Sequence, residues 1–192
     1  MKKAALHNLG CKVNAYETEA MQHLLEEAGY EIVPFTQKAD VYVINTCSVT
    51  NMADRKSRQM LHKAKKNNPD SIVVAAGCYV QTSEKDVLND LSVDIVIGND
   101  RKHDLVRLLE EYSLDSVNDT VDDINDGKHD FEELFIDQTK EHTRAFIKVQ
   151  DGCNQFCSYC IIPYARGRVR SRRFENVIAE VERLAANGFK EV

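Results

Sequence analysis

Short apolar runs alternate with amphipathic stretches through the first hundred or so residues. The apolar runs cover 4–10, 40–46, 71–77 and 93–99, and the stretches that follow them cover 14–30, 48–70, 82–91 and 101–112. Apolar strands that alternate with helices favour a mainly parallel sheet with helices on both faces. The pattern therefore predicts an α/β fold built on an open, mainly parallel sheet.

The stretch 14–30 carries signals for both ends of a helix. Asn14 is a good N-cap residue, and Glu17 follows it three positions later, as in a capping box. Gly29 comes directly after the last residue of the helical period and can end the helix. We expect a helix between these two signals.

Three cysteines occupy the same position in this alternating pattern. Cys11, Cys47 and Cys78 each come directly after a predicted strand. Ligands of open α/β sheets bind beyond the carboxyl ends of the strands, so the three thiols converge if their strands are neighbours. Gly10 and Gly77 would let backbone and ligand approach closely. A single cysteine of this kind is usually a small buried apolar residue, but the repeated position favours a site.

The character of the chain changes at residue 113. Residues 113–142 hold ten Asp and Glu but two Lys, without sustained periodicity, which predicts an acidic linker with at most one short paired strand at 131–136. After it, 144–150 is a predicted strand, 173–188 a predicted helix, and 189–192 begins another apolar run. We divide the chain into 1–112, 113–142 and 143–192. The last part is too short to close a core, so we expect an incomplete second α/β domain.

Composition restricts the class of protein. The 192 residues are 43% hydrophobic and 29% charged, with a net charge of -6, which is typical of a soluble globular protein. No apolar run approaches the roughly 20 residues that span a bilayer, and the start is too polar for a signal peptide. We expect a cytoplasmic protein with no membrane partner. In that reducing compartment, six cysteines indicate metal binding or chemistry rather than disulfides.

The other three cysteines form one loop. Cys153, Cys157 and Cys160 have the spacing CxxxCxxC, with Tyr159 before the last of them. Thiolates hold iron–sulfur clusters, and four complete a cubane, so a loop of three leaves one iron open to a small molecule. Zinc favours four ligands in paired CxxC units. The six histidines are scattered, and we expect them at the surface. From the residues alone, an iron–sulfur electron carrier or a zinc-binding module remains an alternative.

The segment "GCNQFCSYC" resembles the signature of the radical S-adenosylmethionine (SAM) superfamily, CxxxCxΦC, with Tyr159 at the aromatic position. The resemblance implies that Cys153, Cys157 and Cys160 hold a [4Fe-4S] cluster whose open iron binds SAM, with Tyr159 beside this cofactor. It also implies reductive cleavage of SAM to a 5′-deoxyadenosyl radical. The segment 143–192 would then be the first β/α unit of a (β/α) barrel.

The upstream segments "NLGCKVNAYETE", "NTCSVTNMADRKSRQ" and "AAGCYVQ" resemble the amino-terminal domain of the methylthiotransferases. This resemblance implies that Cys11, Cys47 and Cys78 hold a second [4Fe-4S] cluster, which handles the inserted sulfur. One SAM supplies the methyl group and another the radical. The implied partners are tRNA, a reductant such as flavodoxin or ferredoxin, and a sulfur donor.

The residues near the first cysteine distinguish three branches of that family. "GCKVN" followed by "AYETE", and later "IIPYARGRVRSRR", is most similar to the branch that adds methylthio at carbon 2 of N6-threonylcarbamoyladenosine, at position 37 next to the tRNA anticodon. The branches acting on isopentenyl-adenosine (GCQMN) and on a ribosomal-protein aspartate (GCPKN) remain alternatives. Later barrel strands and the usual carboxy-terminal RNA-binding domain lie outside these residues, so we expect this chain alone not to turn over.

Arginines follow the second cysteine loop closely: Arg166, Arg168, Arg170, Arg172 and Arg173. Residues 143–192 hold nine Lys and Arg against five Asp and Glu, so positive charge is in local excess. Arginine binds phosphate through bidentate hydrogen bonds, and a positive patch beside an active site suits a nucleic acid. We predict that this group contacts tRNA. The alternative is a solvated loop, which we also expect for the basic stretch 54–66.

Overall fold

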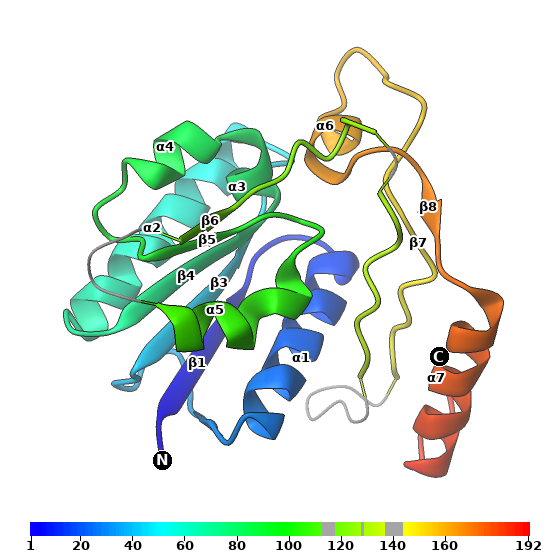
Figure 1. Cartoon of the computed structure of the whole chain (residues 1–192), viewed down its shortest axis with the longest axis horizontal. Coiled ribbons are helices and arrows are strands. Elements are labelled where there is room, and N and C mark those ends of the chain that lie inside the picture. The colour runs from blue at the N-terminus through cyan, green and yellow to red at the C-terminus, as the bar shows by residue number, and fades with distance from the viewer. Residues whose placement is uncertain (113–117, 128, 137–143) are drawn as a thin grey trace.

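A parallel sheet forms the centre of the first domain. The computed structural model describes all residues except 113–117, 128 and 137–143 (Figure 1). Within the described residues the sheet has six strands in the order β2-β1-β3-β4-β5-β6, all parallel. Their bounds are β1 Lys3–Asn8, β2 Glu31–Ile32, β3 Val41–Thr46, β4 Ile72–Gly77, β5 Ile95–Ile97 and β6 Asn118–Thr120. The predicted open, mainly parallel sheet is confirmed.

Helices cover both faces of this sheet. One face carries α1 (Lys12–Glu27), the 3-10 turn η1 (Lys102–Asp104) and α5 (Leu105–Glu111), and the other carries α2 (Asn51–Asn67), α3 (Cys78–Thr82) and α4 (Glu84–Leu88). Successive strand residues point to opposite faces. In β3, Val43 therefore packs with Met21 of α1, whereas Ile44 packs with Leu61 of α2. In the described parts of the chain, no helix combines the length and apolar character needed to cross a bilayer.

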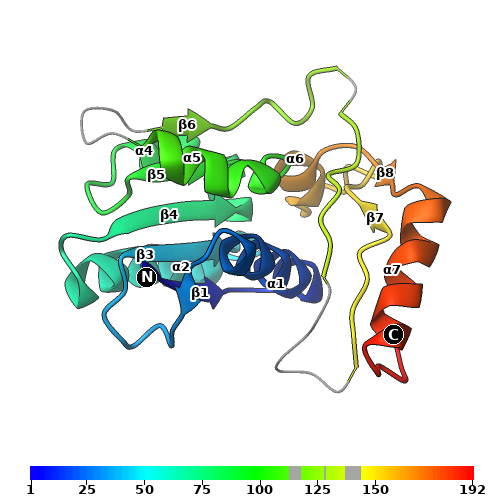
Figure 2. The ribbon, with the colours of Figure 1, turned by 60° about the horizontal axis from the view of Figure 1, so that its bottom comes forward.

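The segment from residue 144 onward lies beyond the carboxyl ends of the strands. It contains β7 (Gln150–Asp151), α6 (Ile162–Arg166), β8 (Arg170–Ser171) and α7 (Phe174–Ala186), and β7 pairs antiparallel with β8. Figure 2 shows the arrowheads of β3 and β4 pointing towards α6. The fold thus places the second cysteine loop at the edge of the sheet where the first three cysteines were predicted.

Three local predictions are corrected by the structure. The predicted strand 144–150 is wrong except at Gln150, because among the described residues only β8 pairs with this segment. The short strand allowed at 131–136 is also wrong: this segment is extended, and Leu134 and Ile136 pack on Tyr16 of α1 instead. β6 pairs with β5 inside the predicted linker, where acidic composition concealed it. The parts of the linker at 113–117, 128 and 137–142 lie outside the described residues.

The start of α1 also differs from the prediction. The N-cap residue is Cys11, and Asn14 and Glu17 lie inside the helix, both fully buried. Asn14 donates to the carbonyl oxygens of Leu9 and Thr46, each at 2.8 Å. The capping box is therefore wrong, because these two polar side chains point into the protein. The predicted end is confirmed: Gly29, with φ +84°, follows the C-cap residue.

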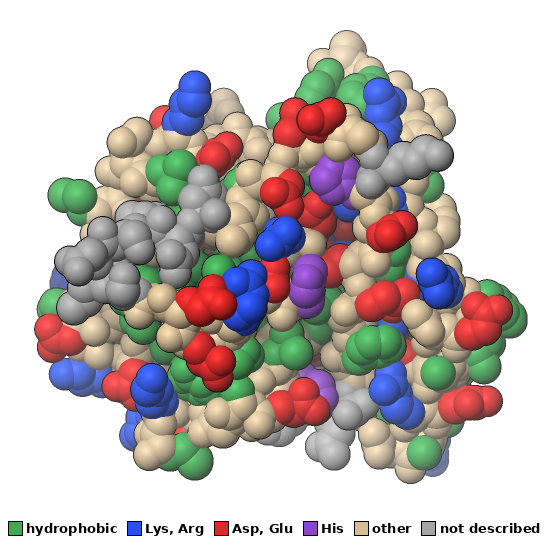
Figure 3. Space-filling view, in the orientation of Figure 1, with side chains coloured by type: hydrophobic (Ala, Val, Ile, Leu, Met, Phe, Trp, Pro, Cys, Tyr) green, Lys and Arg blue, Asp and Glu red, His purple; other side chains and the backbone are tan. Residues whose placement is uncertain are grey.

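The helix α7 forms as predicted, but its apolar face is only partly covered by described residues. Leu184 is fully buried, whereas Phe174 is 73% and Ile178 40% exposed. Figure 3 shows hydrophobic side chains at the surface over this helix. The helix is amphipathic in sequence, and part of its apolar side faces outward in this chain.

Candidate iron–sulfur centre

The first three cysteines lie at one edge of the sheet because their strands are neighbours. β1 pairs with β3 and β3 with β4, in a register that places Asn8 opposite Asn45 and Thr46 opposite Gly77. Cys11 is the N-cap residue of α1, Cys47 directly follows β3, and Cys78 is the first residue of α3. The prediction that they follow adjacent parallel strands is confirmed. Their role as ligands stays a prediction.

Two glycines permit the close approach of these loops. Gly10 has φ +103°, and a Cβ atom on it would lie 2.6 Å from the Sγ atom of Cys47. Gly77 has φ +98°, and its Cβ would lie 2.5 Å from both the side chain of Asn45 and the carbonyl oxygen of Thr46. Contacts this short do not occur, so both positions require glycine. Gly10 in particular leaves room for the thiol of Cys47 beside the Cys11 loop.

The three thiols have different surroundings. Cys11 is exposed, whereas Cys47 and Cys78 are buried. The Sγ atom of Cys11 lies 3.9 Å from Oδ1 of Asn14, and Nδ2 of Asn99 lies 3.6 Å from Sγ of Cys78. Burial raises the pKa of the Cys78 thiol, while Arg166 and the Asn99 hydrogen bond oppose that shift. The surroundings of Cys78 thus contain a cation and a donor that favour its charged form.

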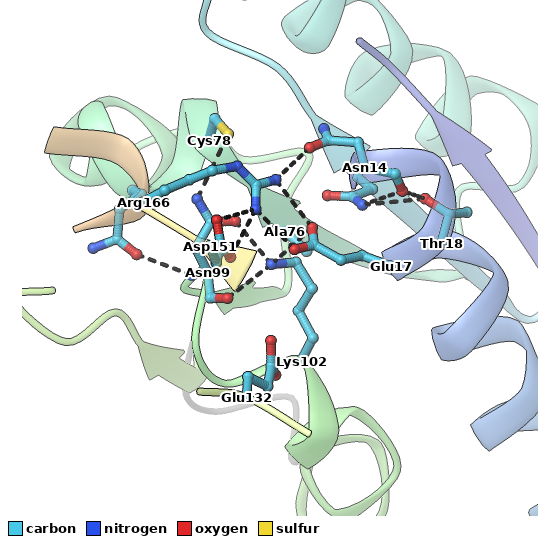
Figure 4. A network of polar contacts seen from close by, with 12 residues as sticks. Asn14, Glu17, Thr18, Ala76, Cys78, Asn99, Lys102, Glu132, Asp151 and Arg166 are labelled. Atoms are coloured by element: carbon cyan, nitrogen blue, oxygen red, sulfur yellow. Dashed lines mark hydrogen bonds and ion pairs between the residues drawn. The ribbon is translucent and has the colours of Figure 1, made fainter. Parts of the chain in front are cut away.

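Arg166 lies at the centre of a buried polar network between the first domain and α6 (Figure 4). It donates through Nη1 to Oε1 of Glu17 at 2.9 Å and to both oxygens of Asp151, and through Nη2 to Oδ1 of Asn14 at 2.6 Å. Lys148 donates to the same Glu17 oxygen at 2.7 Å. We call the five charged residues Glu17, Lys102, Lys148, Asp151 and Arg166 the buried ion network.

Opposite charges stabilise the ionised forms within this network. Burial alone raises the pKa of Glu17, but Arg166, Lys102 and Lys148 hold it well below its usual range. Burial likewise opposes the lowered pKa of Asp151, which Arg166 and Lys148 produce. The pKa of Lys148 is raised, because Glu17 and Asp151 outweigh its burial. These directions favour the charged forms of Glu17, Asp151 and Lys148, and the five residues comprise three basic and two acidic side chains.

The second cysteine loop is more open than the first site. Cys157 is exposed, and Cys153 and Cys160 are half-buried. Backbone bonds shape the loop: Cys153 N donates to the carbonyl oxygen of Gly167 and Cys160 N to that of Cys157, at 3.0 and 2.9 Å. Phe156 has φ +47°, which is unusual for a residue other than glycine. Tyr159 is 91% exposed, and its predicted place beside SAM stays a prediction.

Phe156 is held by contacts on both sides. The guanidinium of Arg168 lies 4.2 Å from the centre of its ring, and Tyr164 meets the ring edge-on at 5.4 Å. A strained backbone persists only where surrounding contacts determine it, and such positions cluster at ligand sites. Arg168 therefore has a structural contact within the loop in addition to any external one.

A second buried polar cluster fixes α7 to α1. Arg172 donates to Glu133 at 2.8 Å and also pairs with Glu180. The hydroxyl of Tyr16 donates to the carbonyl oxygen of Leu134 at 2.6 Å and also contacts Glu180. Burial and the carboxylate of Glu180 together raise the pKa of Tyr16. Tyr16 lies on the same helix, α1, as Asn14 and Glu17. Both buried arginines, Arg166 and Arg172, therefore contact side chains of α1.

The five arginines predicted to contact tRNA therefore divide into two groups. Arg166 and Arg172 are buried against carboxylates, at 4% and 6% exposure, so phosphate has no access to them in this structure. Arg168 and Arg173 are exposed, and Arg170 is half-buried, with one nitrogen donating to the carbonyl oxygen of Arg166 at 2.8 Å. Contact with tRNA stays a prediction for these three.

Sequence reasoning missed most of the buried ion network. One usable signal was the helical period of α1, which places Asn14 and Glu17 on the same side as buried Met21. Another usable signal was that Asn99, like the cysteines, comes shortly after a strand, which places it at the same edge of the sheet. Lys148 and Asp151 had no such signal, because their burial depends on the docking of the second segment.

The donor set fits sulfur-ligated iron better than a single bound ion. Among the described residues, no group of three or more His, Cys, Asp or Glu side chains could hold one metal ion. A cubane needs no such tight group, because each thiolate binds a different iron. Three thiols on three loops, with Gly10 and Gly77 keeping side chains away, suit that arrangement. Of the described histidines, His62 and His103 are exposed as expected, whereas His7, His23 and His129 are half-buried; His142 lies outside the described residues.

Comparison with known proteins identifies the class. The chain belongs to the family described as Uncharacterized protein family UPF0004, which matches residues 3–98, and residues 147–192 match the Radical SAM superfamily. The predicted resemblance to the radical SAM methylthiotransferases is thereby confirmed, together with the relatives below. The division into 1–112, 113–142 and 143–192 stays a prediction.

Individual relatives are more specific. The chain is 45% identical to the threonylcarbamoyladenosine tRNA methylthiotransferase MtaB of Bacillus subtilis (strain 168), covering 100% of this chain and 43% of that protein. For MtaB of Aquifex aeolicus (strain VF5) the identity is 44%, covering 99% and 46%. It is 35% identical to the tRNA-2-methylthio-N(6)-dimethylallyladenosine synthase of Thermoanaerobacter sp. (strain X514), covering 97% and 41%. The chain thus spans less than half the length of these relatives.

Proposed function

We propose that this chain carries the two cysteine sites of a cytoplasmic radical SAM tRNA methylthiotransferase. Its reaction would insert a methylthio group at carbon 2 of N6-threonylcarbamoyladenosine, at position 37 of tRNA. One observation carries the proposal: Asn99 lies 3.6 Å from Sγ of Cys78 and donates at 2.6 Å to the carbonyl oxygen of Ala165, which follows Cys160 closely in sequence. The helix α6, which follows the second cysteine loop, therefore contacts the first cysteine site, as suits a reaction that uses both sets.

Each set would hold one [4Fe-4S] cluster. Cys153, Cys157 and Cys160 would leave one iron for SAM, and exposed Tyr159 lies next to the last of them. When bound, cluster and cofactor supply the electron and the radical, given a reductant such as flavodoxin or ferredoxin. Cys11, Cys47 and Cys78 would hold the second cluster, which needs a sulfur donor. The chain's own part is to hold these groups close together and to keep Cys47 and Cys78 away from water.

The choice of substrate rests on the relatives and on charge. The identity of 45% to a threonylcarbamoyladenosine enzyme exceeds the 35% to a dimethylallyladenosine enzyme. Exposed Arg168 and Arg173, with half-buried Arg170, supply positive charge beside the second loop. Such charge suits the phosphates of a tRNA. Action on isopentenyl-adenosine is the second candidate, since that relative also aligns over 97% of this chain.

Anaerobic reconstitution with iron and sulfide tests the two sites. We expect about eight irons in the parent chain, and about four in each of two variants, Cys11/Cys47/Cys78→Ala and Cys153/Cys157/Cys160→Ala. Stoichiometric zinc would instead support a structural module. In a chain completed with the remaining residues of the Bacillus subtilis relative, adding SAM should change the electron paramagnetic resonance spectrum only where the second set is intact. Clusters whose spectrum is unaffected by SAM in that completed chain would support an electron carrier.

The substrate is tested with a chimera. In it, the remaining residues of the Bacillus subtilis relative follow Val192, and the host lacks its own enzyme for threonylcarbamoyladenosine. Mass spectrometry of tRNA nucleosides should detect the methylthio derivative with the chimera but not with the 192-residue chain alone. The chimera with Cys153, Cys157 and Cys160 changed to alanine is the matched control. Product from the control, or none from the chimera, would contradict the proposal, whereas product from the chain alone would contradict only the expectation that the 192 residues do not turn over by themselves.

A further inference from the structure

Arg166 has an unusual position for a residue near a cofactor loop. It follows the second cysteine loop in sequence, yet its guanidinium is buried against α1 and lies near Cys78 of the first site (Figure 4). We propose that Arg166 is a positioning residue for the first cysteine site, which makes the affinity of that site for electrons depend on the docking of α6. This inference rests on the proposed cluster at Cys11, Cys47 and Cys78.

Arg166 fixes the orientation of Asn14. The amide nitrogen of Asn14 donates to two backbone carbonyl groups, and its Oδ1 accepts from Nη2 of Arg166 at 2.6 Å. The same Oδ1 lies 3.9 Å from Sγ of Cys11. Arg166 therefore engages the acceptor that faces the thiol. When Cys11 is a thiolate, this positive partner offsets the repulsion between the amide oxygen and the sulfur.

Docking of α6 also places a hydrogen-bond donor at Cys78. Nδ2 of Asn99 donates to the carbonyl oxygen of Ala165 at 2.6 Å and lies 3.6 Å from Sγ of Cys78, while Oδ1 of Asn99 accepts from Lys102 at 2.8 Å. Ala165 immediately precedes Arg166 in α6. A hydrogen bond to a cluster thiolate is a recognised means of raising a reduction potential.

The charge of Arg166 acts in the same direction. Three cations, Lys102, Lys148 and Arg166, meet the carboxylates of Glu17 and Asp151. Glu132 accepts from the backbone and ring of His103 and also acts on Lys148, so the carboxylates offset the charge of the lysines. Arg166 is the cation that the docking of α6 brings beside Cys78 (Figure 4). A cluster held by three thiolates is anionic, and reduction adds further negative charge, so nearby buried cations favour the reduced state.

Redox titration of the first cluster tests this inference. All variants are made in the Cys153/Cys157/Cys160→Ala chain, so that only the first cluster contributes to the measured midpoint potential. We expect Arg166→Gln to lower the midpoint potential, and a tenfold weaker preference for the electron corresponds to about 59 mV. Arg166→Lys, which keeps the charge but loses the forked contact, should shift it less. The matched control is Arg172→Gln, which removes another buried, carboxylate-paired arginine from this segment but should leave the potential unchanged.

Each outcome has a definite meaning. Equal potentials in Arg166→Gln and Arg172→Gln, with the cluster present in both, would overturn the inference and leave the proposed function intact. Loss of the cluster in Arg166→Gln alone, with unchanged circular dichroism, would support a positioning role. Loss in both variants would show that Arg166 only holds the fold. Absence of iron from the first site of the parent would overturn the proposed function and the inference with it.

Discussion

Replacing Glu17 by glutamine removes one negative charge from the buried ion network without changing the shape of the side chain. Glu17 is fully buried, and its two oxygens contact Arg166 at 2.9 and 3.2 Å, Lys148 at 2.7 Å and Lys102 at 3.3 Å. In the variant, Lys148 and Arg166 keep only the carboxylate of Asp151, and Lys102 loses its ion-pair partner Glu17. The amide group of glutamine also directs a donor towards groups that have no acceptor to offer.

The expected loss of stability is large. Breaking a buried ion pair by removing one partner typically costs about 3–5 kcal/mol, because the remaining charge stays buried. We expect the upper half of that range, since one carboxylate serves three cations here. With a urea slope of about 2 kcal/mol per molar, the midpoint of unfolding should fall by about 2 M.

Urea unfolding of the reduced, metal-free chain, followed by circular dichroism, measures this change. The control is Glu27→Gln on the same helix, where the carboxylate is 64% exposed and lies 3.5 Å from His23. An exposed pair of this kind contributes about 0–1 kcal/mol, so its midpoint should barely move. If Glu17→Gln unfolds at the same urea concentration as Glu27→Gln, the ion network does not stabilise the docked state as argued.

Two further predictions concern acid and the Gly10 loop. Because the pKa values of Glu17 and Asp151 are lowered in the folded state, the unfolded chain binds more protons in acid; stability should fall as pH drops below about 4.5, through the folded-state values. Urea midpoints measured against pH check this, and an unchanged midpoint down to pH 3 would refute it. Gly10→Ala should displace Cys47 and remove the iron of the first site, measured by iron counting. Gly29→Ala, whose φ is also positive but whose Cβ meets nothing within 4 Å, should keep that iron.

The placement of the first cysteines could be predicted because it depends on local pattern and one topological rule. Cys47 follows a wholly buried strand, and Cys78 follows the next one, so parallel pairing alone brings them to one edge. The pairing of β6 could not be found in this way, because its backbone bonds to β5 do not require apolar side chains.

The roles of Glu17 and Arg166 could not be predicted for a different reason. Asn14 and Glu17 have the spacing of a capping box, which is a local signal, whereas their burial depends on Arg166, which is 152 and 149 positions away in sequence. The arginine run indicated a positive surface, yet Arg166 and Arg172 find carboxylates on other elements. Charge counted along a sequence does not reveal which charges cancel after folding.

The separation in sequence between α1 and its buried partners in α6 and α7 also determines the order in which these contacts can form during synthesis. Arg166 and Glu17 are 149 positions apart, and Glu180 and Tyr16 are 164 apart. Because a chain is made from its amino terminus, β1 to β5 and their helices can assemble before residue 166 exists. At that stage Glu17 can form an ion pair with Lys102 but not with Lys148 or Arg166, so its carboxylate stays hydrated. The edge that carries Cys11 and Cys78 is not covered by α6 until the ribosome has moved beyond the second cysteine loop.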